Sequence, residues 1–350
     1  MKLSKIVLSS LVALSAATVA LPVVQHVTGE VTIVQAQEET VTLKRYYTAA
    51  HGDKAFTAVT VLLKGDVIVD AVIDEFQFTV AGKGFEGVPN SDSDFGGGYA
   101  EGQVLFSKLA NNEAYSALMA EKAGSTVTYA DNFAAIVASV KGKTLAEAKA
   151  VAEEVSALGD NGKVSDVVSG ATLVDTGNYI TAIVEAAEKG IEFAGVAAGT
   201  TKVELKQALV APHGTRSFGL VSVAVEGDKV VGSVIDEFQF ADAGAYEGVP
   251  NSEGEFAKGY AEGKILVSKI ANNEAYSAAM AEKAGSTVAY LNSLTAITTF
   301  ANGKTVEEIN AGITEVEALG ENGKVADVVS GATLADTAGY LHAIVDVASK

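Results

Sequence analysis

The chain has 350 residues, of which 25 are basic and 44 acidic, so its formal net charge is −19, and it contains no cysteine. Such a charge repels phosphate backbones and argues against nucleic-acid binding. The lack of cysteine excludes disulfides, thiolate metal sites and a lipid-modified cysteine at a signal junction. Stability must come from an apolar core, for which 48 % hydrophobic residues provide the material.

Residues 1–36 have the features of an export signal peptide. Lys2 and Lys5 form a short basic region, residues 6–24 are apolar, and small residues around Ala36 fit a cleavage site. The apolar run is also close to the length that spans a bilayer, so an uncleaved N-terminal anchor is the alternative. In both cases we expect the rest of the chain to be exported, extracellular or associated with the cell surface.

The remaining sequence is a tandem duplication. The segments NNEAYSA, MAEKAGSTV and DVVSGATL each occur twice, 161 positions apart, and IDEFQF occurs twice, 162 positions apart. Self-similarity over such a length indicates one domain copied in tandem. We expect domains at residues 41–189 and 203–350, each of about 150 residues, joined by a linker at 190–202.

Each repeat is expected to have an α+β fold, with an antiparallel sheet and flanking helices. A β-hairpin opens the repeat, and a polar, glycine-rich loop follows it. Two helices come next; the first ends at a glycine, and the second begins with a T-x-x-E capping box. A third helix closes the repeat. The predicted hairpin strands are 56–63 and 66–73, with 221–225 and 229–235 in the second repeat, and the predicted helices are 112–123, 144–158 and 172–189, with 273–284, 305–319 and 333–350.

The DVVSGATL segment precedes the last predicted helix of each repeat. A β-branched stretch at 164–168 runs into Ser169, Gly170 and Ala171, and the helix is expected to begin at Thr172. The threonine hydroxyl would then lie beside unpaired backbone N–H groups, which attract anions. Glycine permits a backbone angle that other residues resist, and the small residues allow a phosphate to come close. This pattern predicts an anion or phosphate site, repeated at Ser330, Gly331, Ala332 and Thr333.

An alternative needs no ligand. Thr172 and Asp175 have the spacing of a capping box in which aspartate replaces the usual glutamate, and Thr333 and Asp336 repeat it. Such a box would only satisfy the first N–H groups of the helix.

The pattern D-x-x-S-G-A-T resembles the flavinylation motif of the FMN-binding domain family. The resemblance implies that FMN is joined through a phosphoester to the final threonine by an ApbE-like flavin transferase, which uses FAD and Mg²⁺. It covers seven residues in each repeat, and the tandem, exported layout is similar to family members of Gram-positive bacteria that serve extracellular electron transfer. The matching residues are Asp166, Ser169, Gly170, Ala171 and Thr172, and Asp327, Ser330, Gly331, Ala332 and Thr333.

The resemblance implies an electron-transfer flavoprotein, a redox carrier more than an enzyme with its own substrate. It would take electrons from a membrane quinone and NADH dehydrogenase system and pass them to extracellular acceptors such as ferric iron. The lipoprotein form of the family carries a cysteine after its signal, which this chain lacks. The alternative function is a duplicated cell-surface binding or structural module without flavin.

The loop before the first predicted helix supplies candidate walls for a flavin pocket. Asn90 could hydrogen-bond the isoalloxazine edge and Tyr99 could stack on its face. Asn251 and Tyr260 repeat them. The alternative is turn chemistry around Pro-Asn and a packed tyrosine. His51 and His213 are the only histidines that recur, and a structural or surface role is favoured for them over ligation.

Overall fold

The computed structural model describes residues 22–27, 30–35, 40–159, 162–198, 203–320 and 323–350. The chain separates into two compact units, Met1–Glu39 and Thr40–Lys350. The first contains an antiparallel pair of strands, β1 (Pro22–Val27) and β2 (Glu30–Gln35). Most of the predicted signal, including residues 6–21 and Ala36, lies outside the described residues. Within the described ranges, no helix has the length and apolar character needed to cross a membrane.

The second unit contains two antiparallel sheets, one from each repeat. Their strand orders are β6-β5-β4-β3-β7 and β11-β10-β9-β8. The strands of the first sheet are β3 (Thr40–Thr48), β4 (Ala55–Lys64), β5 (Val67–Val80), β6 (Gln103–Ser107) and β7 (Ile191–Ala197). Those of the second are β8 (Val203–Val210), β9 (Ser217–Glu226), β10 (Lys229–Asp242) and β11 (Lys264–Ser268).

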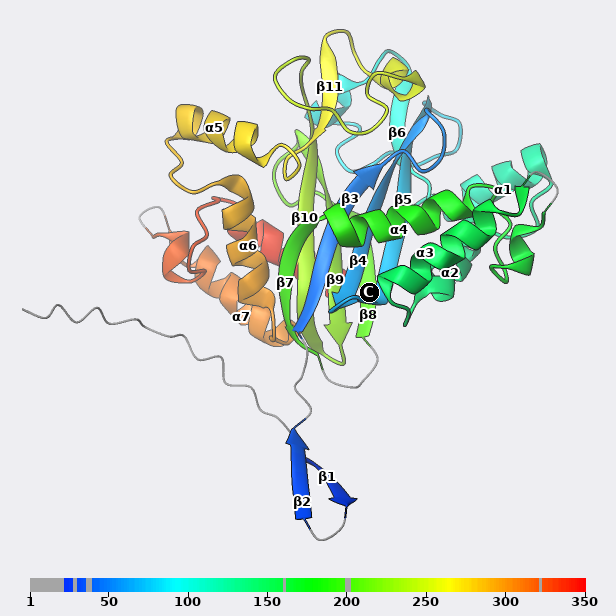
Figure 1. Ribbon diagram of the computed structural model, residues 1–350. Coiled ribbons are helices and arrows are strands. Elements are labelled where there is room, and N and C mark those ends of the chain that lie inside the picture. Colours follow the sequence, from blue (N-terminus) through cyan, green and yellow to red (C-terminus); the bar gives the residue numbers. More distant parts are fainter. Residues whose placement is uncertain (1–21, 28–29, 36–39, 160–161, 199–202, 321–322) are drawn as a thin grey trace, which may run out of the picture. The chain divides into compact units, whose positions relative to one another are not determined.

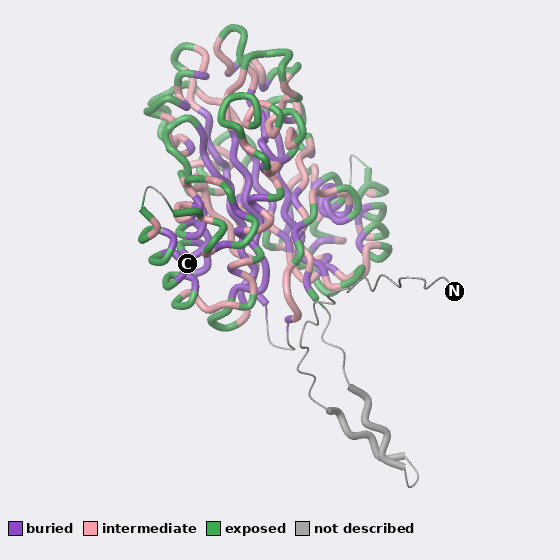
Figure 2. Tube along the Cα trace, turned by 90° about the vertical axis from the view of Figure 1, so that its left-hand side faces the viewer, coloured by how far each residue is buried: buried purple, intermediate pink, exposed green. Residues whose placement is uncertain are grey.

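The helices of each repeat lie on the outer side of that repeat's sheet, where α2, α4, α6 and α8 contact the strands and α3 and α7 pack on α4 and α8 (Figure 1). Helix α4 packs on β3 and β4, and α8 packs on β8 and β9. The layers of this unit are therefore helices, sheet, sheet and helices, and Figure 2 shows buried residues running through the central strands. The helices are α1 (Asn112–Ala123), α2 (Tyr129–Val140), α3 (Leu145–Ser156), α4 (Thr176–Lys189), α5 (Asn273–Ala284), α6 (Tyr290–Ala301), α7 (Val306–Glu317) and α8 (Thr337–Ala348).

The α+β class is confirmed, and so are several local predictions. The hairpins form as β4–β5 and β9–β10. Helix α1 ends at Gly124, whose φ of 64° is left-handed, and α3 begins with the capping box of Thr144 and Glu147. Strands β3 and β8 precede the hairpins and were not predicted. Helices α2 and α6 were also missed.

The stretch 190–202 is not simply a linker, because it contains β7. This strand pairs antiparallel with β3 and forms the edge of the first sheet. The two repeats belong to one compact unit, Thr40–Lys350.

Aromatic side chains from both repeats fill the space between the sheets. Phe56 and Phe76 stack with their ring centroids 4.9 Å apart, and Phe218 and Phe238 stack at 5.0 Å. The two pairs touch, with 5.8 Å between the rings of Phe76 and Phe218. Aromatic burial of this kind dominates core energetics. Each repeat therefore depends on the other to complete its core.

Candidate functional site

The DVVSGATL segment folds into a tight turn that leads into the last helix of each repeat. The Ala171 N–H donates to the Val168 carbonyl at 3.0 Å, and the equivalent bond joins Ala332 to Val329. At the third position of these turns, Gly170 has a φ of 90° and Gly331 a φ of 88°. Type II turns require such an angle, so the expected reason for glycine is confirmed.

The helix does not begin at the threonine, which corrects two predictions. Helix α4 starts at Thr176 and α8 at Thr337. Asp336 is at the N-cap but makes no capping hydrogen bond, because its carboxylate lies 2.5 Å from Nδ1 of His213. The capping box is therefore wrong, and so is an anion site in which the threonine caps the helix. In the β-branched stretch before the motif, Val164–Asp166 form a 3-10 helix.

In each repeat, a side chain near the start of a helix accepts hydrogen bonds from the motif threonine. These two helices, α2 and α6, were not predicted from the sequence. The N–H and hydroxyl of Thr172 donate to Oδ1 of Asn132 in α2, at 2.6 and 3.1 Å. In the second repeat the N–H of Thr333 donates to the Ser293 hydroxyl of α6 at 2.8 Å. Both threonines are nevertheless exposed, and so are the acidic, serine and glycine positions of the motif, whereas its alanine is fully buried (Asp166, Ser169, Gly170, Ala171; Asp327, Ser330, Gly331, Ala332).

Thr333 lines a pocket of about 540 Å³. Helix α5, the first residue of α6, the loop between them, the motif and α8 all contribute to it. Three tyrosines and one methionine provide much of the wall, and a lysine and a histidine are the basic residues. The lining residues are His213, Lys269, Tyr276, Met280, Ala284, Gly285, Ser286, Thr287, Tyr290, Thr333, Leu334, Ala335, Asp336 and Tyr340.

The lining of this pocket is almost the same in both repeats. Of its 14 residues, 13 are identical at the equivalent positions around Thr172, and only Ala335 differs, being replaced by Val174. The neighbouring blocks NNEAYSA and MAEKAGSTV and the more distant block DVVSGATL all contribute to the lining. Helix α6 beside the pocket differs much more, since YLNSLTAITTFA corresponds to YADNFAAIVASV in α2. The two repeats are therefore more alike in the residues that line the pocket than in the helix beside it. This difference in identity was visible in the sequence and could have indicated the pocket.

A buried ion pair supports one side of the pocket. Lys269 Nζ lies 2.7 Å from Glu237 Oε2, and their side chains are 1 % and 0 % exposed. The Tyr290 and Tyr340 hydroxyls donate to the same oxygen, at 2.9 and 2.7 Å. Burial raises the pKa of Glu237, but the Lys269 ammonium and these hydrogen bonds outweigh it and hold that pKa below its usual value. Both partners are therefore charged.

The first repeat contains the same arrangement. Lys108 Nζ lies 2.8 Å from Glu75 Oε2, and the Tyr129 hydroxyl donates to that oxygen at 3.2 Å. His51 Nδ1 lies 2.7 Å from Asp175 Oδ2, as His213 lies beside Asp336.

The candidate residues from the preceding loop are not part of the Thr333 pocket. The Asn90 amide donates to the carbonyls of Gly214 and Ser217 in the other repeat, and its φ of 66° is left-handed. The Tyr99 hydroxyl is hydrogen-bonded to Ser91. Asn251 and Tyr260 make the reciprocal contacts, to Gly52, Ala55 and Ser252. Their observed contacts are those of the turn-and-packing alternative.

Comparison with protein-family models, curated proteins and solved structures finds no match to this chain.

Proposed function

We propose that each repeat carries FMN, joined through a phosphoester to Thr172 and Thr333, and that the protein is an exported electron carrier. It would pass electrons from a membrane quinol pool to extracellular acceptors such as ferric iron. One observation carries the proposal: an exposed threonine of a flavinylation-like motif lines a pocket whose residues are repeated almost unchanged in both halves.

The residues present fit a flavin. Ligand pockets typically enclose about 300–1,000 Å³ and combine apolar or aromatic walls with a few polar groups. Tyr276, Tyr290 and Met280 suit the flat, polarizable isoalloxazine ring. Ser286 and Thr287 offer hydroxyls to the ribityl and phosphate oxygens. When bound, the flavin supplies the redox chemistry, while the protein orients it and sets its surroundings.

Attachment requires a separate enzyme. A threonine hydroxyl is a weak nucleophile without a base, and the Thr172 hydroxyl donates to an amide oxygen, which is not one. Exposure of Thr172 and Thr333 leaves them accessible to an ApbE-like transferase. In this proposal the transferase recognises the exposed motif residues, and these residues do not contact the flavin ring. They are Asp166, Ser169, Asp327 and Ser330.

Replacing both threonines by valine should abolish covalent flavin and leave the fold intact, because valine has a similar shape but no hydroxyl. The measurement is the intact mass of denatured protein, exported from cells with an active flavin transferase, followed by peptide mapping. Wild-type protein should gain two FMN units, and Thr172→Val or Thr333→Val alone should gain one. Flavin that survives denaturation on the double variant would rule out these sites. An unmodified wild type would favour the structural-module alternative.

The glycine of the motif offers a second test. Gly331→Ala places a side chain at a φ of 88° with its Cβ 3.3 Å from that of Ala296. We expect it to cost about 1 kcal/mol or more of stability and to reduce flavin attachment at Thr333. Gly244→Ala is the matched control, since its φ of 89° is equally strained but its Cβ meets no atom within 4 Å. Equal flavin content in both variants would contradict a role for the turn in presenting the threonine.

A further inference from the structure

A pair of pockets lies where the two repeats meet, and its two members differ in composition. The first has a volume of about 410 Å³ and the second about 330 Å³. Six positions of the repeat have the same residue in both pockets; Ser107, for example, lines the first pocket and its equivalent Ser268 lines the second. The other repeat contributes residues that are not the same: Gln207, Ala208 and Leu209 line the first pocket, and Arg45, Tyr46 and Tyr47 line the second.

A buried aspartate lies beneath each pocket with matching local partners. Asp74 accepts hydrogen bonds from the N–H groups of Glu75 and Leu109 and from the Ser107 hydroxyl, at 2.7, 3.1 and 2.6 Å. Asp236 accepts the equivalent three bonds from Glu237, Ile270 and Ser268.

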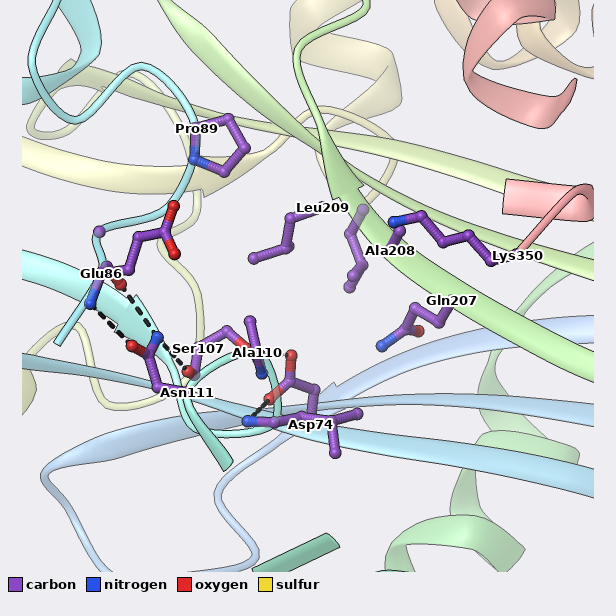
Figure 3. Close-up of a pocket in the computed structure, with 13 residues that line it drawn as sticks. Asp74, Glu86, Pro89, Ser107, Ala110, Asn111, Gln207, Ala208, Leu209 and Lys350 are labelled. Carbon is purple, nitrogen blue, oxygen red and sulfur yellow. Dashed lines mark hydrogen bonds between the residues drawn. The ribbon is translucent and has the colours of Figure 1, made fainter. Parts of the chain in front are cut away.

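Asp236 has one partner more than Asp74. The Tyr47 hydroxyl donates to Asp236 Oδ2, and Tyr47 covers this carboxylate, which is fully buried and does not line the second pocket. Position 209, the equivalent of Tyr47, is a leucine, which has no hydroxyl. Asp74 therefore lines the first pocket while 97 % of its surface is buried. Figure 3 shows it beneath Ser107, with Leu209 on the opposite strand.

We propose that the pocket beside Asp74 binds a small phenol, whose hydroxyl donates to the Asp74 carboxylate as the Tyr47 hydroxyl donates to Asp236. The side chain of Tyr47 is the template for the ligand. Leu109, Leu209 and Leu220 provide apolar walls for an aromatic ring, and Asp74 and Ser107 provide the polar end. This inference does not depend on flavin attachment.

The probe is 4-methylphenol, which is the tyrosine side chain itself, titrated into the intact protein by calorimetry at about pH 8.5, where the Asp74 carboxylate is ionised. We expect one saturable site per chain. Toluene lacks the hydroxyl and should bind at least about tenfold more weakly, because it leaves the carboxylate without its donor. Absence of saturable binding, or equal binding of toluene, would overturn the proposal.

Three variants locate the site. Leu209→Tyr restores the missing tyrosine and should abolish binding, and Asp74→Asn should weaken it about tenfold, since a hydrogen bond to a charged acceptor is lost. Tyr47→Leu should uncover Asp236 and raise the stoichiometry from one to two. Thermal unfolding verifies that each variant is folded. Binding that persists in folded Leu209→Tyr protein, or in Asp74→Asn protein with unchanged affinity, would place the ligand elsewhere.

Discussion

Replacing Lys269 by methionine should lower the free energy of unfolding by about 3–5 kcal/mol, because it leaves the buried Glu237 carboxylate without its counter-charge. The two charged atoms are 2.7 Å apart and both side chains are almost completely buried. The Tyr290 and Tyr340 hydroxyls would remain as the only side chains on that carboxylate oxygen within the described structure.

Urea denaturation at pH 7 measures this effect, with two controls. The double variant Lys269→Met, Glu237→Gln removes both charges and should recover much of the loss. Lys264 and Asp242 form an ion pair with the same separation, 2.7 Å, but are 41 % and 83 % exposed. Lys264→Met should therefore cost much less than Lys269→Met. A loss for Lys269→Met as small as that for Lys264→Met would contradict the importance of the buried pair.

The second large effect is a pH dependence that depends on Asp74. Burial raises the pKa of Asp74 to about 7, against the lowering effect of the hydrogen bonds from Ser107, Leu109 and Glu75. The unfolded chain releases this proton near pH 4, so the folded state holds more protons between pH 4 and pH 7. Stability is therefore lost as the pH rises through this range, and a shift of about 3 units corresponds to about 4 kcal/mol.

Asp74→Asn removes the proton exchange and keeps the shape of the side chain. We expect the variant to exceed wild type in stability by a margin that grows from pH 4 to pH 8. The measurement is the free energy of unfolding of both proteins across that range. Only their difference reports on Asp74, because Glu237, whose folded pKa is lowered, changes stability in the opposite direction. A difference that is constant with pH would refute the prediction.

Local signals were enough to predict the elements that depend on local contacts. The capping box at Thr144 and the glycine stop at Gly124 involve residues within a few positions, and both were found. The missed helix α2 had a readable pattern as well, because its buried residues Tyr129, Phe133, Ile136 and Val140 have helical spacing. Such elements can be predicted from the sequence alone.

The failures share a cause, which is a partner far away in the chain. The predicted capping box needed Asp175 inside the helix, but Asp175 precedes α4 and its carboxylate is bound to His51, 124 positions earlier. Asn90 was expected at a flavin but binds carbonyls of the other repeat, more than 120 positions away. Strand β7 lies within the predicted linker, and its partner β3 lies at the opposite end of the repeat. Spacing along the chain contains no information about such contacts.

The candidate site was predicted in part. The motif pointed to Thr172 and Thr333, and the structure adds the pocket beside Thr333. The lysine and glutamate of its ion pair, Lys269 and Glu237, come from two separate segments, and neither had a motif of its own. Their signal in the sequence was that the first repeat has the same residues, Lys108 and Glu75, at the equivalent positions.

Tyr47 and Leu209 have a consequence for how such a protein can evolve. If the same architecture were assembled from two copies of a single repeat, one gene would encode both subunits, and every residue of one pocket would recur in the other. With both copies in one polypeptide, a codon in one half can change independently. One interface pocket has a tyrosine where its twin has a leucine, while 13 of the 14 residues that line the Thr333 pocket recur at the equivalent positions of the first repeat. In a single polypeptide, equivalent positions of the two repeats can therefore differ, as they can between the two subunits of a heterodimer.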